Sequence, residues 1–203
     1  PGVAHEAGAD RAQGRQVGSV HVARDITERK QSEDRGRLLS EVTSQLLASD
    51  QPQQVVDSLC RKVTEHLGCH AFFNYLVDEA SGRLHLNACA GIPDETARQI
   101  EWLDFGRSVC GCVARDGRGI VAEQIQTTSD PRTDLVKGFG VQAYCCHPLT
   151  AADSLLGTLS FGSRKRPRFA GEEIGLMRAV ADLVAIAMER GQTRAALASA
   201  RMA

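Results

Sequence analysis

The sequence contains no run of eighteen or more apolar residues and no charged segment leading into a short apolar stretch at its start. The first absence argues against a membrane-spanning helix, and the second against a secretory signal. Charge of one sign is not in excess either, because 24 lysines and arginines balance 25 acidic residues. No overall field therefore favours nucleic acid or an anionic membrane surface as a partner. We expect a cytoplasmic chain with neither kind of partner.

Motifs of common enzyme classes are also missing. The sequence has no glycine-rich phosphate loop of the Walker A type and no Ser-His-Asp order. Its seven cysteines are an odd number in a chain without a secretory signal. That count argues against a disulfide framework and predicts reduced thiols.

The length fits one domain with flanking segments, because 203 residues with 42% hydrophobic content can bury one core of ordinary size. Residues 1–16 lack a periodic pattern and are expected to be poorly ordered. Val20 and Val22 then alternate with polar residues as in a short strand. Asp25 and Glu28 have the spacing of a helix N-cap and its capping-box partner.

Three segments have the periodicity of long helices. Residues 26–49 carry apolar residues at spacings of three and four, which predicts a connector helix. Asp50 is expected to cap a second helix, with Pro52 in its first turn and Gly68 at its end. A third helix, beginning at Phe169, is the strongest periodic signal in the chain.

Shorter elements separate the second and third helices. Two strands at 71–77 and 84–90 are joined by a turn, and a hairpin spans 140–162 with Gly157 in its second strand. Between them we expect a helix from Pro93 to near Trp102 and Leu103, a helix from Ser108 to Gly117, a brief strand at 119–122 and a turn of helix at 134–139. This order predicts an α+β fold with an antiparallel sheet, long helices on one face, and short helices and loops on the other.

Two stretches carry a family resemblance. GRSVCGCV at 106–113 and GVQAYCCHPLTAADSLLGTLSFG at 140–162 together resemble the GAF domain, a module that senses small molecules and signals. Within them, VCGCVA and AYCCHPL are typical of GAF domains in bacterial sensor histidine kinases. The resemblance covers residues 38–188 and implies a GAF-like antiparallel sheet with a pocket under the short helices. It also implies a regulatory module of a two-component system that binds a small ligand or senses redox state and relays it through dimeric helices.

A second resemblance concerns the N-terminal segment. The strand around Val20 and the motif Asp25, Ile26 and Thr27 resemble the C-terminal end of a PAS domain. Too few residues precede the motif for a PAS fold, which needs roughly a hundred. We therefore interpret residues 1–25 as a truncated PAS remnant and 189–203 as a linker helix toward a covalently linked transmitter, expected to be a histidine kinase. Any kinase activity would lie in that transmitter, so we expect this chain not to be an enzyme.

Element ends and the family layout predict the pocket. No residue is assigned a catalytic role. The predicted pocket residues are Phe73, Tyr75, Trp102, Val109, Cys110, Val113, Tyr144 and Cys146, with Asp130 at the rim. Gly106 and Gly111 allow a tight loop beside Cys110, which either holds a ligand near the backbone donors of a helix start or only lets the helix pack on the sheet.

No cofactor is required by the sequence, and its identity is left open. Cys110 and Cys112 point in different directions on a helix, and the neighbours Cys145 and Cys146 point to opposite faces of a strand. We therefore expect ordinary buried cysteines and no metal site. A less favoured alternative has His147 ligating haem or metal with Cys146 or Cys110. Covalent bilin is not expected, because Pro131-Arg132 occupies the place where phytochrome-like GAF domains have a Cys-His pair.

Two other functions remain open at this point. Free methionine-(R)-sulfoxide reductases resemble GAF domains and have a VCG motif, which Cys110 matches. They also need an attacking thiolate in the loop before the central strand, and this chain has no cysteine between Cys112 and Cys145. The other alternative is a purely structural dimerisation module that binds no ligand.

The last helix predicts the homodimer. Its two neighbouring apolar stripes give a face wider than one sheet contact needs, so one stripe is expected to meet a partner helix. The predicted seam consists of Ile174, Met177, Ala181, Val184 and Met188.

Overall fold

The computed structural model describes residues 29–30, 32–49, 51–152 and 154–202. The chain divides into two units, residues 1–40 and 41–203. Within the first unit, residues 29–30 and 32–40 are helical, and Arg29 and Glu33 form an ion pair one helical turn apart. Residues 41–48 are helical as well and open the second unit. The predicted strand around Val20 and the cap at Asp25 lie outside the described residues.

The second unit is built on a six-stranded antiparallel sheet with the order β3-β2-β1-β6-β5-β4. The strands are β1 (Ala71–Asp78), β2 (Arg83–Ala90), β3 (Trp102–Leu103), β4 (Ile120–Ala122), β5 (Ala143–Ala151) and β6 (Ser154–Ser163). The helices are α2 (Pro52–His66), α3 (Asp94–Gln99), α4 (Ser108–Asp116), α5 (Asp134–Gly138) and α6 (Gly171–Met202), with a short 3-10 turn at Pro131–Thr133. The predicted α+β fold with an antiparallel sheet is confirmed.

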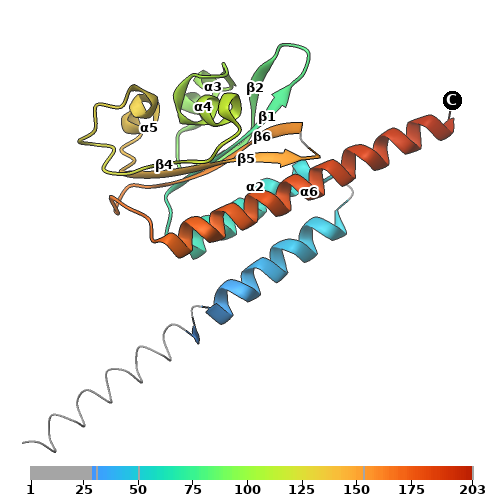
Figure 1. The fold of residues 1–203 in the computed structure, drawn as a ribbon, viewed down its shortest axis with the longest axis horizontal. Helices are drawn as coiled ribbons and strands as arrows, with labels where there is room; N and C mark the ends of the chain where they lie inside the picture. Colours follow the sequence, from blue (N-terminus) through green and yellow to red (C-terminus); the bar gives the residue numbers. More distant parts are fainter. Residues whose placement is uncertain (1–28, 31, 50, 153, 203) are drawn as a thin grey trace, which may run out of the picture. The chain divides into compact units, whose positions relative to one another are not determined.

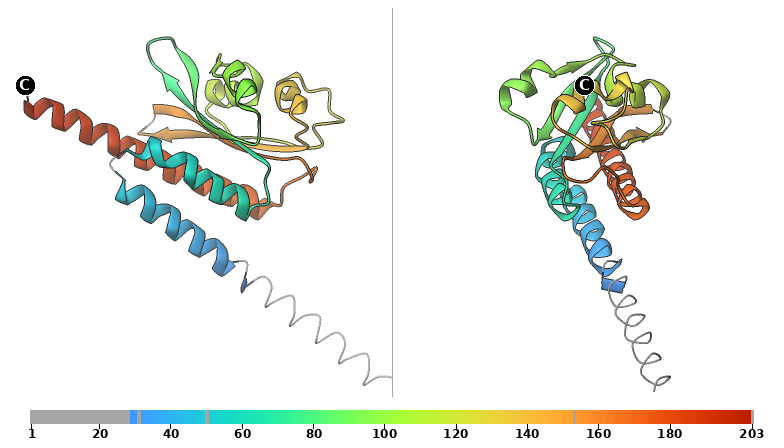
Figure 2. Two further views of the ribbon diagram at one scale, coloured as in Figure 1. Left: turned by 180° about the vertical axis from the view of Figure 1, so that it is seen from behind. Right: turned by 90° about the vertical axis from the view of Figure 1, so that its left-hand side faces the viewer.

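The helices divide between the two faces of this sheet (Figure 1). α2 and α6 lie against one face, whereas α3, α4 and α5 lie over the other, an arrangement that Figure 2 shows from two further directions. Alternation along β5 separates the two faces, because neighbouring side chains of a strand point to opposite sides. Tyr144 and Cys146 therefore face α4, and Cys145 and His147 face α6.

Local sequence signals explain the element ends. Pro52 opens α2, and Val56, Leu59 and Val63 on its apolar stripe are fully buried. The N-cap of α2 is Gln51 and not Asp50 as predicted. Gly117, with φ 64°, ends α4 in the left-handed conformation that glycine adopts without strain.

Two predicted boundaries are wrong. Trp102 and Leu103 do not end a helix but form β3, which pairs with His85 and Leu84 of β2. A strand of two residues has no periodicity to read, and this one is held by tertiary pairing, including the hydrogen bond from the Leu86 amide to the carbonyl of Glu101 at 2.8 Å. α6 begins at Gly171 rather than Phe169.

The predicted dimer seam is also wrong in its placement. Met177, Ala181, Val184 and Met188 are buried within the single chain, and Ile174 is half-buried. α6 packs on β5, β6 and α2, so a wide apolar face is covered without a partner. Among the described side chains of α6, the large apolar ones that are exposed are Ile186 and Leu197. The homodimer itself stays a prediction.

Candidate functional site

The loop that leads into α4 has an unusual backbone. Gly106 has φ 81°, and Ser108, at the start of the helix, has φ 57° although it is not glycine. Such conformations are uncommon for residues with a side chain and concentrate at ligand sites. The loop closes on the helix through a hydrogen bond from the Gly106 amide to the carbonyl of Gly111 at 2.7 Å.

Gly111 allows this loop to lie against the helix. A Cβ at position 111 would lie 2.4 Å from the carbonyl oxygen of Asp104, closer than any side chain tolerates. No side chain caps the start of α4, so the first-turn amides of the helix have no partner within it. The sequence left open whether Gly106 and Gly111 form part of a pocket or only let the helix pack on the sheet. Both roles fit the structure, because close packing at Gly111 places the start of α4 beside a cleft.

The cleft beside α4 has a volume of about 560 Å³. It is lined by Gln99, Ile100, Trp102, Leu103, Gly106, Arg107, Ser108, Pro131, Arg132, Asp134 and Leu135. A much smaller inner cavity of about 10 Å³ shares Ile100, Leu103, Ser108 and Leu135 with the cleft. Its other walls are Phe73, Tyr75, Cys110, Val136, Phe139 and Tyr144. The outer cleft thus has the charged side chains, and the inner cavity is lined mainly by apolar and aromatic ones.

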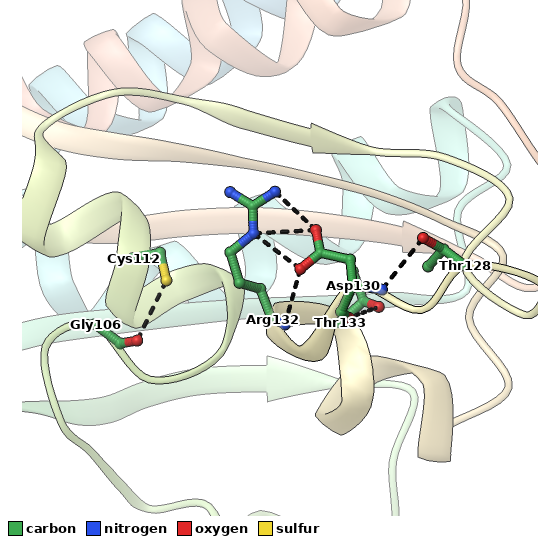
Figure 3. A network of polar contacts seen from close by, with 6 residues as sticks. All are labelled: Gly106, Cys112, Thr128, Asp130, Arg132 and Thr133. Atoms are coloured by element: carbon green, nitrogen blue, oxygen red, sulfur yellow. Dashed lines mark hydrogen bonds and ion pairs between the residues drawn. The ribbon is translucent and has the colours of Figure 1, made fainter.

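Two arginines lie at the mouth. Arg132 is held by Asp130, whose carboxylate accepts hydrogen bonds from the Arg132 guanidinium at 2.7 to 3.0 Å and from its amide at 3.0 Å (Figure 3). The hydrogen bonds from Arg132 hold the pKa of Asp130 below its usual range. Arg107 has no ion-pair partner in the described part of the chain. The Arg107 guanidinium can therefore bind an anionic group of a ligand.

A buried network of thiols and hydroxyls lies behind the inner cavity and reaches it at Cys110 and Tyr144. The sulfur atoms of Cys110 and Cys146 are 3.8 Å apart, and Cys110 Sγ is 3.2 Å from Tyr144 Oη. Tyr144 Oη lies 2.6 Å from Ser160 Oγ, which donates to the carbonyl of Phe73 at 3.1 Å. All of these side chains are buried. This series of hydrogen bonds therefore ends at a backbone carbonyl of β1.

The two thiols differ in acidity. Cys146 donates to Cys110, and this hydrogen bond, opposed by burial and helped by Tyr144 and Ser160, lowers the pKa of Cys110 to about 7. Burial raises the pKa of Cys146 and of Tyr144 well above their usual values. Cys110 is therefore the member of the pair that loses its proton first.

Other cysteines of the chain have raised pKa values. Burial raises the pKa of Cys60, and it raises those of Cys69 and Cys145 to about 12. His147 Nε2 lies 3.2 Å from Cys145 Sγ on the α6 side of β5. The alternative of haem or metal held by His147 with Cys146 or Cys110 is wrong, because those thiols lie on the opposite face of the strand. Among the described residues no group of three His, Cys, Asp or Glu side chains is arranged to hold a metal ion.

The predicted pocket residues fall into four groups. Phe73, Tyr75, Cys110 and Tyr144 line the inner cavity, and Trp102 lines the outer cleft. Val109, Val113 and Cys146 belong to the buried core behind the cavity and do not line it. Asp130 lines neither space but fixes Arg132, which does.

Sequence reasoning missed most of the cleft wall. Leu103 and Leu135 come from elements too short for periodicity to place, and Ile100 directly follows the short helix α3. Arg107 and Ser108 follow Gly106 directly, so the glycine pair flanking the start of α4 was the signal that could have found them. The expectation of ordinary buried cysteines overlooked the Cys110–Cys146 pair, because 36 residues separate them.

The family comparison covers most of the second unit. The family model described as "GAF domain" matches residues 49–189. The chain belongs to the GAF domain family. No curated protein matches the sequence.

Solved structures show the same GAF fold. The GAF domain of a phosphoenolpyruvate-protein phosphotransferase from Coxiella burnetii aligns with TM-score 0.68 and 19% identity over 80% of this chain and 96% of that one. Free methionine-R-sulfoxide reductase from Neisseria meningitidis, solved with its substrate, aligns with TM-score 0.66 and 18% identity over 79% and 91%. A domain of a proposed two-component sensor histidine kinase from Sinorhizobium meliloti gives TM-score 0.53 and 22% identity over 67% and 89%. At these identities the likeness establishes the fold alone.

Proposed function

We propose that this GAF domain is the sensory part of a bacterial two-component protein and binds a small molecule in the cleft beside α4. The observation that carries the proposal is the cleft of about 560 Å³, which shares four wall residues with a small, mainly apolar inner cavity. Its volume is in the range of small-molecule sites. The family membership supports a regulatory role, and the histidine kinase output, the upstream PAS domain, the homodimer and the cytoplasmic location are parts of the proposal. No described helix combines the length and apolar character that crossing a bilayer requires.

The walls favour a ligand with one anionic end and an apolar body. Arg107 and the uncapped first turn of α4 supply positive charge and amide donors at the mouth. Ile100, Leu103 and Leu135 supply the apolar surface further in. A small carboxylate or phosphate ester with a hydrocarbon part satisfies both regions.

The fold provides a path from the cleft to the long helices. α4 packs on β5 and β6 from one side, and α6 packs on the same strands from the other. A ligand that draws the start of α4 toward the cleft changes how α4 sits on β5, and α6 shares that strand. Binding would thus shift a two-state arrangement of the long helices that lead to an output domain.

A thermal-shift screen tests the proposal. We expect at least one compound from a set of small carboxylates, phosphate esters and amino acids to raise the melting temperature of the purified chain. A ligand at a hundredfold excess over its Kd adds about 2.7 kcal/mol to the free energy of unfolding. Leu135→Trp, which fills the shared wall of both spaces, should weaken that ligand at least tenfold, measured by calorimetric titration.

Leu197→Trp is the matched control, because Leu197 is exposed on α6, far along the chain from the cleft. It should bind the ligand as the unsubstituted protein does. A screen in which no compound raises the melting temperature would favour the purely structural dimerisation module. Equal binding by the two variants would show that the ligand binds outside the cleft.

The reductase alternative predicts a different result. Among the described residues, Cys110 is the only thiol that lines either space, and it lies in the wall of an inner cavity of about 10 Å³. The loop from Gln124 to Asp134 has no cysteine. We therefore expect no thiol-dependent turnover of free methionine-(R)-sulfoxide, assayed by methionine release with dithiothreitol. Turnover that Cys110→Ser abolishes would make the domain an enzyme.

A further inference from the structure

The buried thiol pair is the feature that ligand binding leaves unexplained. Cys110 on α4 and Cys146 on β5 have their sulfur atoms 3.8 Å apart, and a disulfide needs about 2.05 Å. No other pair of the described cysteines is linked by a thiol–thiol contact. We propose that a small hydroperoxide converts Cys110 and Cys146 into an intrachain disulfide that fastens α4 to β5. This inference does not depend on the proposed small-ligand function.

Hydrogen bonds select Cys110 as the thiol that reacts with the oxidant. As a thiolate it accepts from the Cys146 thiol and from Tyr144 Oη, which lies 3.2 Å away. Ser160 Oγ at 3.7 Å is a longer contact. Thr158 Oγ1 is buried without a hydrogen-bond partner in the described part of the chain, yet it too lowers the pKa of Cys110. Cys110 has more such donors than Cys146, for which Thr158 alone lowers the pKa, so the pair is asymmetric.

Access comes through the inner cavity. Cys110 lines that cavity, which shares four residues with the outer cleft. A volume of about 10 Å³ holds roughly one water-sized probe. Hydrogen peroxide is little larger than water, whereas a hydroperoxide with an aromatic or long alkyl group is not. The geometry therefore selects the smallest oxidant.

The chemistry balances in two steps. The Cys110 thiolate attacks one peroxide oxygen, the O–O bond breaks, and the released hydroxide takes up the proton that Cys110 had lost, giving a sulfenic acid and water. The Cys146 sulfur then attacks the Cys110 sulfur, and the sulfenic hydroxyl leaves as water with the Cys146 proton. Two thiols and one hydrogen peroxide thus become one disulfide and two waters. A dithiol reductant reverses the reaction.

Closing the bond changes the packing of α4. The sulfur atoms must approach by about 1.8 Å, the difference between their separation and the S–S bond length. Cys110 then loses its contact with Tyr144, and α4 is tied covalently to the strand that α6 covers from the other side. Oxidation would therefore act on the same α4–β5 contact through which we propose that a ligand signals.

Peptide mapping tests the proposal on the purified, reduced chain. After treatment with equimolar hydrogen peroxide and alkylation of free thiols, tryptic peptides 108–115 and 138–164 should be joined by one disulfide. Because each peptide holds two cysteines, the bond is assigned in Cys112→Ser and Cys145→Ser variants, which should keep the link. Cys110→Ser and Cys146→Ser should lose it, and dithiothreitol should reverse it in the unsubstituted protein.

The rate should also depend on pH. With Cys110 titrating near 7, the thiolate fraction and the oxidation rate rise roughly tenfold between pH 6 and 8. The groups that face Cys110 are Tyr75 from β1 and Tyr144 and Cys146 from β5, and their pKa values are all raised, so none of them titrates in that window. Tyr144→Phe removes one donor and should move the rise to higher pH.

The competing outcomes are distinct. A link between Cys110 and Cys112, a sulfinic acid on Cys110 with Cys146 still alkylated, or no change in either thiol would each overturn the proposal. Faster oxidation by cumene hydroperoxide than by hydrogen peroxide would overturn the access route through the inner cavity. A link that forms with the expected peroxide preference and pH profile supports it.

Discussion

Replacing Val184 with glutamate is expected to destabilise the folded domain rather than to separate two copies of it. Val184 is fully buried on α6, between that helix and the rest of the chain. A carboxylate there loses apolar burial and leaves an unpaired charge out of water, which together cost about 4 kcal/mol or more. For a domain of this size that corresponds to a fall in melting temperature of about 8 to 16 °C, measured by circular dichroism.

Ile186→Glu is the matched control on the same helix. Ile186 has 52% of its surface exposed, so the substitution should change the free energy of unfolding by less than about 0.5 kcal/mol. Analytical ultracentrifugation of the Ile186→Glu variant also tests whether a homodimer forms through the exposed side of α6. If Val184→Glu melts like the unsubstituted protein and sediments as a monomer, the dimer seam predicted from the sequence would be correct after all.

Gly111→Ala is expected to destabilise the domain and distort the cleft. The new methyl group would lie 2.4 Å from the Asp104 carbonyl, so the loop before α4 must move. Overpacking of this kind costs about 1 to 3 kcal/mol. Urea denaturation should show the loss as a lower midpoint with an unchanged slope.

Gly175→Ala provides the comparison. Position 175 lies in α6, where the new methyl group would meet nothing within 4 Å, and glycine is a poor helix former. The substitution should raise the free energy of unfolding by up to about 1 kcal/mol. Equal stability of the two alanine variants would mean that Gly111 is not held against the loop.

Strong periodicity and turn residues made much of the fold predictable. The stripe of α2, the glycine that ends α4 and the hairpin of β5 and β6 all follow from local sequence. β3 did not, because two residues form a strand only when β2 is already in place. The stripes of α6 were seen, but sequence does not say that β5, β6 and α2 together cover them.

The candidate site was predictable only in part, for the same reason. Phe73, Tyr75 and Tyr144 were named from element ends and the family layout, and all three line the inner cavity. The contact between Cys110 and Cys146 depends on how α4 packs on β5, and spacing along the chain contains no information about it. Val109 and Val113 were assigned to the pocket because a helix beside a cavity has both a lining face and a core face, and periodicity does not distinguish them.

Mapping a bound molecule by NMR tests the central proposal most directly. The ¹⁵N-labelled chain would be titrated with the compound that gives the largest thermal shift. If the cleft beside α4 is the sensory site, the largest amide shifts fall on Ser108, Val109, Cys110 and Leu135, and Leu135→Trp removes them at the same ligand concentration. Shifts confined to the α6 face of the sheet, or unchanged in Leu135→Trp, would contradict that proposal.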